Sequence, residues 1–252
     1  MSLGKGEKIA IKFENPGAMK SLKHETKILN YLYSNKVRQI PAIYWYGLHG
    51  ILPCLVMTYY EYSLAKYIEK KGISQLPKIM EAILSILSNI HKQFVLHRDI
   101  KPENFMIGPG GELILIDFGL ATFYIGEDGQ HVPDEECNTI IGSPRYVSIH
   151  ILEGHRYSRR DDLISIGYIF AGFYLGHTPW EPEQRQIQCP INEDPLLIHN
   201  PVNIWRKQNR QIDMFRKWLP EGNWILQFLE EVYAYEYMDI PKYMISHDSS
   251  IV

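Results

Sequence analysis

The chain has little cysteine, no apolar run long enough to cross a membrane, and no large excess of charge of one sign. Its 252 residues include three cysteines, Cys54, Cys137 and Cys189, which lie far apart and form no C-x-x-C pair. Scattered cysteines in odd number argue against a disulfide framework or a zinc site and are typical of free thiols in a reducing compartment. We therefore expect a protein of the cytoplasm or nucleus.

Further absences narrow the class of protein. The longest apolar run, around residues 163–176, is too short for a bilayer and suits a buried core helix. The amino-terminal residues MSLGKGEKIA contain no apolar segment of the kind found in signal peptides. The net charge is −3, so no overall basic field attracts nucleic acid or an anionic membrane. We expect neither as a partner.

The apolar pattern divides the chain into a short strand-rich part and a longer helical part. Strand-like runs cover residues 8–13, 51–60 and 113–116, and helical patterns cover residues 21–33, 64–70, 77–91 and, with a Pro-rich interruption, 161–237. This order predicts an α+β fold with a small β-rich lobe over residues 1–60 and a larger, mainly helical lobe over residues 61–252.

Two motifs in the middle of the chain indicate phosphoryl transfer. HRDIKPEN occupies residues 97–104, and IDFGLA follows at residues 116–121. H-R-D-x-x-x-x-N followed by D-F-G is the pattern of protein kinases. At about 5% per residue type, its four fixed letters match at a given start with a chance of order 10⁻⁵. Coincidence is therefore a poor explanation.

The motif residues have the chemistry that this reaction needs. Asp99 can accept or orient the proton of an attacking hydroxyl group, and Lys101 can neutralise charge on the transferring phosphoryl group. Asn104 and Asp117 offer oxygen ligands for the Mg²⁺ that bridges the phosphates of ATP. The alternative, a charged surface turn, is the weaker interpretation. We expect His97 to be structural.

Two residues upstream of the motifs complete the expected nucleotide site. Lys12 lies in AIK on the first strand, where kinases place the lysine that contacts the phosphates of ATP. Glu25, on the helix that follows, is the candidate partner that holds this lysine. A surface lysine and a solvated glutamate would be the alternative if the downstream motifs were absent.

Three features of the second half have candidate roles around this centre. Gly119 completes the D-F-G motif. Asp162 begins an apolar helix and is expected to brace the catalytic loop through backbone hydrogen bonds, although a helix N-cap is also compatible. GSPRY, residues 142–146, suits a segment that cradles the substrate hydroxyl beside Asp99.

Several segments carry a closer resemblance. They are LKHETKIL (22–29), LHRDIKPENFMIG (96–108), IDFGLA (116–121), QHVP (130–133), GSPRYVSIH (142–150) and YSRRDDLISIGYIFAGFYLGHTPW (157–180). Together they resemble the casein kinase 1 family of serine/threonine protein kinases over about residues 7–180. Most telling are Ser148-Ile149-His150, where other kinases have A-P-E, and residues 158–168, which match S-R-R-D-D-L-x-S-x-G-Y.

This resemblance implies a bilobal kinase fold that binds Mg-ATP under the small lobe. Met57 would be the gatekeeper, and Thr58, Tyr59 and Tyr60 would form the hinge. It further implies a monomer that transfers phosphate to serine or threonine of protein substrates.

The resemblance also implies a preference for substrates that are acidic or already phosphorylated, with Arg145 helping to bind that anion. However, Asn138 stands where the family tends to have a lysine, and the loop over residues 181–200 is acidic and diverged. The preference for phosphorylated substrates is therefore open. Regulation is open as well, with Thr139 and Ser143 as conceivable phosphorylation sites.

The main departure lies at the front of the chain. Kinases cover the phosphates with a glycine-rich loop, but only 11 residues precede Lys12, and Gly4 and Gly6 suit a turn instead. The chain is either naturally minimal or a fragment. We expect slow turnover and a raised KM for ATP.

Two other functions are compatible with the same motifs. One is a catalytically weak or inactive kinase-like scaffold that binds a partner through exposed Trp205, Trp218 and Trp224, although tryptophans more often anchor a core. The other is a small-molecule phosphotransferase, which would not need a peptide-cradling segment such as GSPRY.

Overall fold

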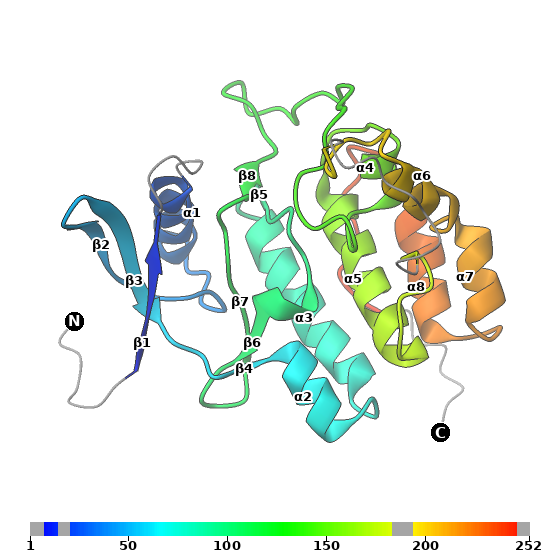
Figure 1. Ribbon diagram of the computed structural model, residues 1–252, viewed down its shortest axis with the longest axis horizontal. Helices are drawn as coiled ribbons and strands as arrows, with labels where there is room; N and C mark the ends of the chain where they lie inside the picture. The colour runs from blue at the N-terminus through cyan, green and yellow to red at the C-terminus, as the bar shows by residue number, and fades with distance from the viewer. Residues whose placement is uncertain (1–7, 15–20, 183–193, 246–252) are drawn as a thin grey trace.

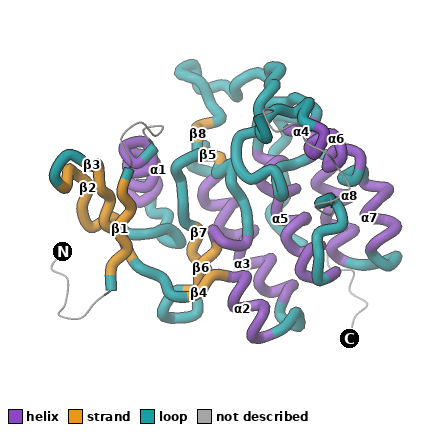
Figure 2. The backbone as a smooth tube through the Cα atoms, viewed as in Figure 1, coloured by secondary structure: helices purple, strands orange, loops and turns teal. Residues whose placement is uncertain are grey.

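The computed structural model describes residues 8–14, 21–182 and 194–245 (Figure 1). A small sheet-rich region lies at one end of the molecule and a larger helical region at the other (Figure 2). The predicted α+β fold with these two regions is confirmed. The predicted boundary between the two lobes, at residue 60, stays a prediction. Cys189, Gly4 and Gly6 lie outside the described residues.

The small region is an antiparallel sheet covered on one face by a helix. Its elements are β1 (Ile9–Phe13), α1 (Leu22–Ser34), β2 (Ile43–His49) and β3 (Leu52–Thr58), with strand order β1-β3-β2. Side chains alternate along β1, so Ala10 and Lys12 share one face while Ile11 and Phe13 are exposed on the other. The expected strand 8–13 and helix 21–33 are thus present within a residue at each end, whereas β2 had no predicted counterpart.

Helix α1 is the link between the two regions. Leu22 packs with Leu55 and Met57 in a small cluster against the sheet. Ile28, Leu29 and Leu32, further along the same helix, belong to the main hydrophobic core. This arrangement follows from the 3.6-residue spacing of its apolar side chains.

The middle of the chain packs around a long helix, α3 (Leu76–His91), which buries one face. It contains β4 (Tyr62–Ser63), α2 (Leu64–Lys71), α3, β5 (Val95–Leu96), a 3-10 turn η1 (Pro102–Asn104), β6 (Phe105–Ile107), β7 (Leu113–Leu115) and β8 (Thr122–Phe123). The strands form two small sheets, β4-β6-β7 and β5-β8. The apolar face predicted for residues 77–91 is buried along α3. These short sheets place the two catalytic motifs on turns between strands.

The helical region is built around α5 (Arg159–Leu175), in which residues 159–171 are all buried. It packs against α8 (Trp224–Tyr233), and α4 (Ile149–Leu152), α6 (Pro201–Gln208) and α7 (Ile212–Trp218) complete the region. The helix begins with the capping-box sequence Ser158–Asp161, in which the Ser158 N–H donates to Asp161 Oδ2 at 2.7 Å. The N-cap is therefore Ser158, and the alternative that Asp162 caps this helix is wrong.

Two of the three cysteines can be placed in the structure. Cys54 is buried and Cys137 is half-buried, and neither forms a disulfide within the described part of the chain. None of the helices in the described ranges combines the length and the apolar character that a membrane crossing requires. Residues 163–175 of the apolar run lie in α5, which is buried up to Ala171, so the expected core helix is present.

Candidate active site

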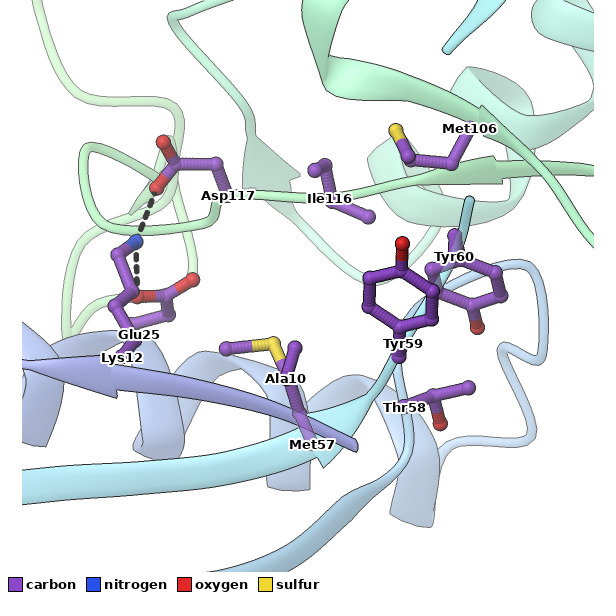
Figure 3. A pocket seen from close by; sticks show the side chains of 10 residues that line it. All are labelled: Ala10, Lys12, Glu25, Met57, Thr58, Tyr59, Tyr60, Met106, Ile116 and Asp117. Atoms are coloured by element: carbon purple, nitrogen blue, oxygen red, sulfur yellow. Dashed lines mark hydrogen bonds and ion pairs between the residues drawn. The ribbon is translucent and has the colours of Figure 1, made fainter. Parts of the chain in front are cut away.

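Lys12 connects the sheet to the D-F-G segment. Its Nζ donates to Glu25 Oε2 on α1 at 2.8 Å and to Asp117 Oδ1 at 2.7 Å. Figure 3 shows the ammonium group lying between the two carboxylates at one end of a pocket. Residues 105 positions apart in the chain are thus joined directly. The expected pairing of Lys12 with Glu25 is present in the structure.

The Lys12 ammonium stabilises the charges of both carboxylates. Burial works to lower the pKa of Lys12, but attraction to Glu25 and hydrogen bonds to both carboxylates leave that pKa raised. Burial raises the pKa of Glu25, and the Lys12 ammonium offsets part of this rise. Burial also acts against the charge of Asp117, yet the hydrogen bond from Lys12 holds its pKa below the ordinary value. Asp117 is therefore ionised at neutral pH.

The rest of the pocket is mostly apolar. The cavity has a volume of about 330 Å³ and is lined by Ala10, Lys12, Glu25, Met57, Thr58, Tyr59, Tyr60, Met106, Ile116 and Asp117. Apolar side chains from β1, β3 and β6 face each other across it, and the three expected hinge residues line one side (Figure 3). Its size and character fall within the range of small-molecule sites.

Asp99 lies at the centre of a hydrogen-bond network. Lys101 Nζ donates to its Oδ2 at 2.6 Å, and the Ser143 hydroxyl donates to its Oδ1 at 2.7 Å. Lys101 also reaches Ser143 Oγ at 3.2 Å. Asn104 Nδ2 donates to the carbonyl oxygen of Asp99 at 2.8 Å and to its Oδ2 at 3.1 Å. The expected catalytic residues are therefore within hydrogen-bonding distance of one another.

The catalytic loop is held in an uncommon backbone conformation. Arg98 has φ 66° and Asp117 has φ 64°, in the left-handed region that side chains other than glycine rarely adopt. Asp162 is buried and accepts from the backbone N–H of His97 at 2.9 Å and of Arg98 at 3.0 Å. Asp162 thus forms the backbone hydrogen bonds that are expected to hold the catalytic loop. His91 Nε2 also donates to Asp162 Oδ2 at 2.9 Å.

His97 is packed inside the site and faces away from solvent. Its Nδ1 accepts from the Asp99 N–H at 3.3 Å, so its Nε2 carries the proton and donates to the Ile116 carbonyl at 3.0 Å. Its ring meets that of Phe118 edge-on at 4.9 Å between centroids. Burial lowers the pKa of His97. These contacts tie the two motifs together and suit a neutral structural histidine.

Two glycines lie beside this arrangement. A Cβ at Gly119 would lie at ordinary contact distance, 3.4 Å from Asp117 Oδ1 and 4.0 Å from Glu25 Oε2, so this glycine borders both carboxylates without being required by space. Gly142 has φ 93°, and a Cβ there would overlap the carbonyl oxygen of Arg98. The segment that begins GSPRY can therefore lie directly on the catalytic loop only because it starts with glycine.

Arg145, the expected anion-binding residue, is exposed at the end of this segment. Its side chain is 57% exposed, and its Nε lies 3.9 Å from Glu181 Oε2. It is outside the pocket that holds Lys12. The structure therefore places Arg145 beside the substrate segment but with a carboxylate as its neighbour.

Sequence reasoning missed three residues that line the pocket and one hydrogen bond at the catalytic aspartate. Ala10 could have been found because it shares a strand face with Lys12 two residues later. Met106 and Ile116 flank the motif residues directly, and both line the pocket. The hydrogen bond from Ser143 to Asp99 had no local signal because 44 positions separate the two residues.

The donor set suits a magnesium–nucleotide complex. The amide nitrogen of Asn104 is used by Asp99, which leaves its amide oxygen as the atom that can coordinate a metal. Asp117 has a second carboxylate oxygen besides the one that binds Lys12. Hard oxygen atoms of this kind are what Mg²⁺ prefers, and the apolar cavity beside them suits a flat base. Asn104, Asp117 and Lys12 are thus the residues that would hold Mg-ATP.

Comparison with known proteins agrees with this geometry. Residues 1–239 match the protein kinase domain family. Casein kinase I homolog 1 of Saccharomyces cerevisiae is 32% identical over 202 residues, which are 75% of this chain and 37% of that protein. Casein kinase I homolog 2 of Schizosaccharomyces pombe is 34% identical over 192 residues, which are 72% of this chain and 44% of that protein. The chain thus spans less than half the length of either relative. From its fold, its site geometry and these matches, the chain belongs to the protein kinase family.

Proposed function

We propose that this chain is a serine/threonine protein kinase that transfers the γ-phosphate of Mg-ATP to hydroxyl groups of proteins. The observation that carries the proposal is the contact between the Ser143 hydroxyl and Asp99 at 2.7 Å, with Lys101 donating to both groups. A hydroxyl group held in this way against a carboxylate and an ammonium is the arrangement that a phosphate acceptor needs. Similarity to the two casein kinase I homologs supports the same proposal.

Each residue has a distinct task in the proposed reaction. Mg-ATP, when bound, supplies the phosphoryl group and a divalent cation that neutralises its charge. Asp99 orients the acceptor hydroxyl and takes its proton. Lys101 places a positive charge where negative charge builds up during transfer. Lys12 binds phosphate oxygens while Glu25 holds its ammonium in position. Tyr59 and Tyr60 follow the end of β3, so their backbone groups lie outside its ladder and can bond an adenine ring.

The test is radiolabelled phosphate transfer from Mg-ATP to casein, with Asp117→Asn beside the wild type. Loss of the ionised metal ligand is expected to reduce transfer by at least about 100-fold. Asp213→Asn is the matched control, because Asp213 is an exposed carboxylate that pairs with Arg216 on α7. Its transfer rate should equal that of the wild type. Thermal unfolding of all three proteins establishes that they are folded.

Three results would contradict the proposal. Full transfer by Asp117→Asn would show that this carboxylate does not hold the metal. No transfer by any folded variant would favour a non-catalytic scaffold, and stabilisation by Mg-ATP would then show whether nucleotide binds. The scaffold alternative requires exposed tryptophans that bind a partner, but Trp218 and Trp224 pack against the core and Trp205 is half-buried. Label in a metabolite but not in casein would favour a small-molecule phosphotransferase.

Several finer expectations belong to the same proposal. Slow turnover and a raised KM for ATP are predictions for the chain as printed, and steady-state kinetics against a relative of this family would test them. Serine or threonine substrates, a monomeric state and a location in the cytoplasm or nucleus are proposed in the same way.

A further inference from the structure

Three arginines converge on one carboxylate beside the substrate segment. Arg206 Nε and Nη2 donate to the two carboxylate oxygens of Glu181, each at 2.7 Å. Arg210 Nη2 approaches Glu181 Oε1 at 3.4 Å, and Arg145 Nε lies 3.9 Å from Oε2. Glu181 is only 15% exposed. A bidentate pair of this geometry is among the strong interactions of charged side chains.

The position of Glu181 is set by the core. The preceding residue, Trp180, is fully buried and packs against Tyr168 and Phe215, with ring centroids 5.4 and 5.5 Å away. Its Nε1 donates to the carbonyl oxygen of Arg145 at 2.9 Å. The packing of Trp180 therefore holds the neighbouring carboxylate next to the substrate segment.

Most donors of Arg206 and Arg210 are already in use. Arg210 is fully buried and donates to the carbonyl oxygens of Pro144, Arg145 and Val147. Burial lowers the pKa of Arg210 to about 10, so a neighbouring anion helps to keep it charged. The Nη1 of Arg206 donates to Asn203 Oδ1 at 2.8 Å. Of the three guanidinium groups, that of Arg145 is the most exposed.

We propose that Glu181 is a specificity-determining residue that acts as an internal anion. Its carboxylate already binds Nε and Nη2 of Arg206. A phosphate or carboxylate on a substrate therefore meets only the single exposed guanidinium of Arg145. One exposed guanidinium binds an anion weakly, whereas two convergent ones bind it strongly. The wild-type site therefore accepts unphosphorylated peptides and has no preference for a phosphorylated or acidic neighbour of the acceptor residue. This inference rests on the proposed kinase function.

Replacing the carboxylate isolates the effect of its charge. Glu181→Gln keeps the shape and one acceptor oxygen but releases a nitrogen of the Arg206 fork. The site then offers two guanidinium groups, from Arg145 and Arg206, to an incoming anion. Glu230→Gln is the matched control, because Glu230 also accepts from an arginine, Arg216 Nε, at 2.8 Å. Both substitutions change the net charge by the same amount.

The first measurement is binding, which does not require catalysis. A phosphoserine peptide, its unphosphorylated counterpart and inorganic phosphate are titrated into each protein. We expect Glu181→Gln to bind the phosphoserine peptide about tenfold more tightly than the wild type, with Glu230→Gln unchanged. Equal affinity of Glu181→Gln and wild type for the phosphoserine peptide would overturn the proposal. A gain for inorganic phosphate but not for the peptide would place the site out of reach of the substrate and would overturn it too.

The second measurement is transfer to the same two peptides, each with a free acceptor serine. The kcat/KM ratio of phosphorylated to unphosphorylated peptide is expected to be about 1 for the wild type and about 10 for Glu181→Gln. A wild-type ratio of about 10 would contradict the proposal. Absence of transfer to either peptide by every protein would count against the kinase function, while the binding measurement would still decide the role of Glu181.

A second variant covers the case in which Glu181→Gln does not fold. The double variant Glu181→Gln/Arg206→Gln removes both partners of the ion pair, so it leaves no unpaired carboxylate beside Arg145 and keeps the net charge unchanged. Phosphoserine-peptide affinity should remain at the wild-type level, because only Arg145 then meets the anion. A tenfold loss would mean that Arg206 binds substrate anions in the wild type, and the proposal would then be wrong.

Discussion

Replacing Asp162 with asparagine tests how the catalytic loop is held. Both oxygens of Asp162 are occupied, because Oδ1 accepts from the Arg98 N–H and Oδ2 from the His97 N–H and from His91 Nε2. The side chain is 1% exposed, so no water can replace a lost partner. An asparagine amide has one acceptor oxygen and would point its NH₂ group at a buried donor.

The magnitude follows from these three contacts. A buried donor left without an acceptor costs about 1–3 kcal/mol, and hydrogen bonds to a charged group contribute about 1.5–3 kcal/mol. We therefore expect a destabilisation of about 3 kcal/mol, which corresponds to a fall in melting temperature of about 6–12 °C for a domain of this size.

The assay is thermal unfolding followed by phosphate transfer on the folded protein. Transfer should fall as well, because Asp162 supports Arg98 in its left-handed conformation. Asp213→Asn, an exposed carboxylate substitution, should melt close to the wild type. A melting temperature for Asp162→Asn within about 2 °C of the wild type would refute the idea that these hydrogen bonds hold the loop.

The pH dependence gives an independent check. Burial works to raise the pKa of Asp162, but the hydrogen bond and charge of His91 leave it below the ordinary value. A carboxyl group whose pKa falls on folding stabilises the protein above its unfolded pKa of about 3.9 and loses that contribution as pH falls through the folded pKa. The difference between wild type and variant should therefore be largest above about pH 4 and shrink in more acidic solution.

Two further substitutions test other contacts. Gly142→Ala should lower the free energy of unfolding by at least about 2 kcal/mol and reduce phosphate transfer. The reason is that φ is 93° and the new Cβ would overlap the Arg98 carbonyl next to Ser143. Wild-type values in both urea unfolding and the transfer assay would contradict that overlap. Tyr243→Phe removes a hydroxyl group 2.7 Å from His91 Nδ1 and should cost about 1 kcal/mol. An unchanged melting temperature would show that this hydrogen bond contributes nothing.

Local patterns predicted local structure well. The spacing of apolar residues along 77–91 indicated a helix, and α3 runs from Leu76 to His91. Fixed motif spacing identified Asp99 and Asn104, which the structure joins by hydrogen bonds. A capping box also has a sequence signature, so Ser158 rather than Asp162 could have been identified as the N-cap.

Contacts between distant segments were not predictable in this way. Arg210 donates to the carbonyl oxygen of Val147, 63 positions away, and no periodicity in either segment indicates that pairing. Strand β2 was missed because IYWYGLH does not alternate polar and apolar residues. β2 is a strand because it pairs with β3, and the residue pattern of β2 by itself carries no information about that partner.

Helix α1 has a consequence for how the protein folds. Among the described residues, the buried cluster on the sheet consists of Leu22, Leu55 and Met57, with the partly buried Ala10, Ile43 and Tyr46 packed against it, and this is a small core to offset the conformational entropy of about 50 ordered residues. We therefore expect the sheet not to be stable on its own. Its stability depends on the larger core, to which α1 connects it through Ile28, Leu29 and Leu32. Cooperativity then extends across the whole molecule, and Glu25 can hold its lysine only while the distant helices are folded.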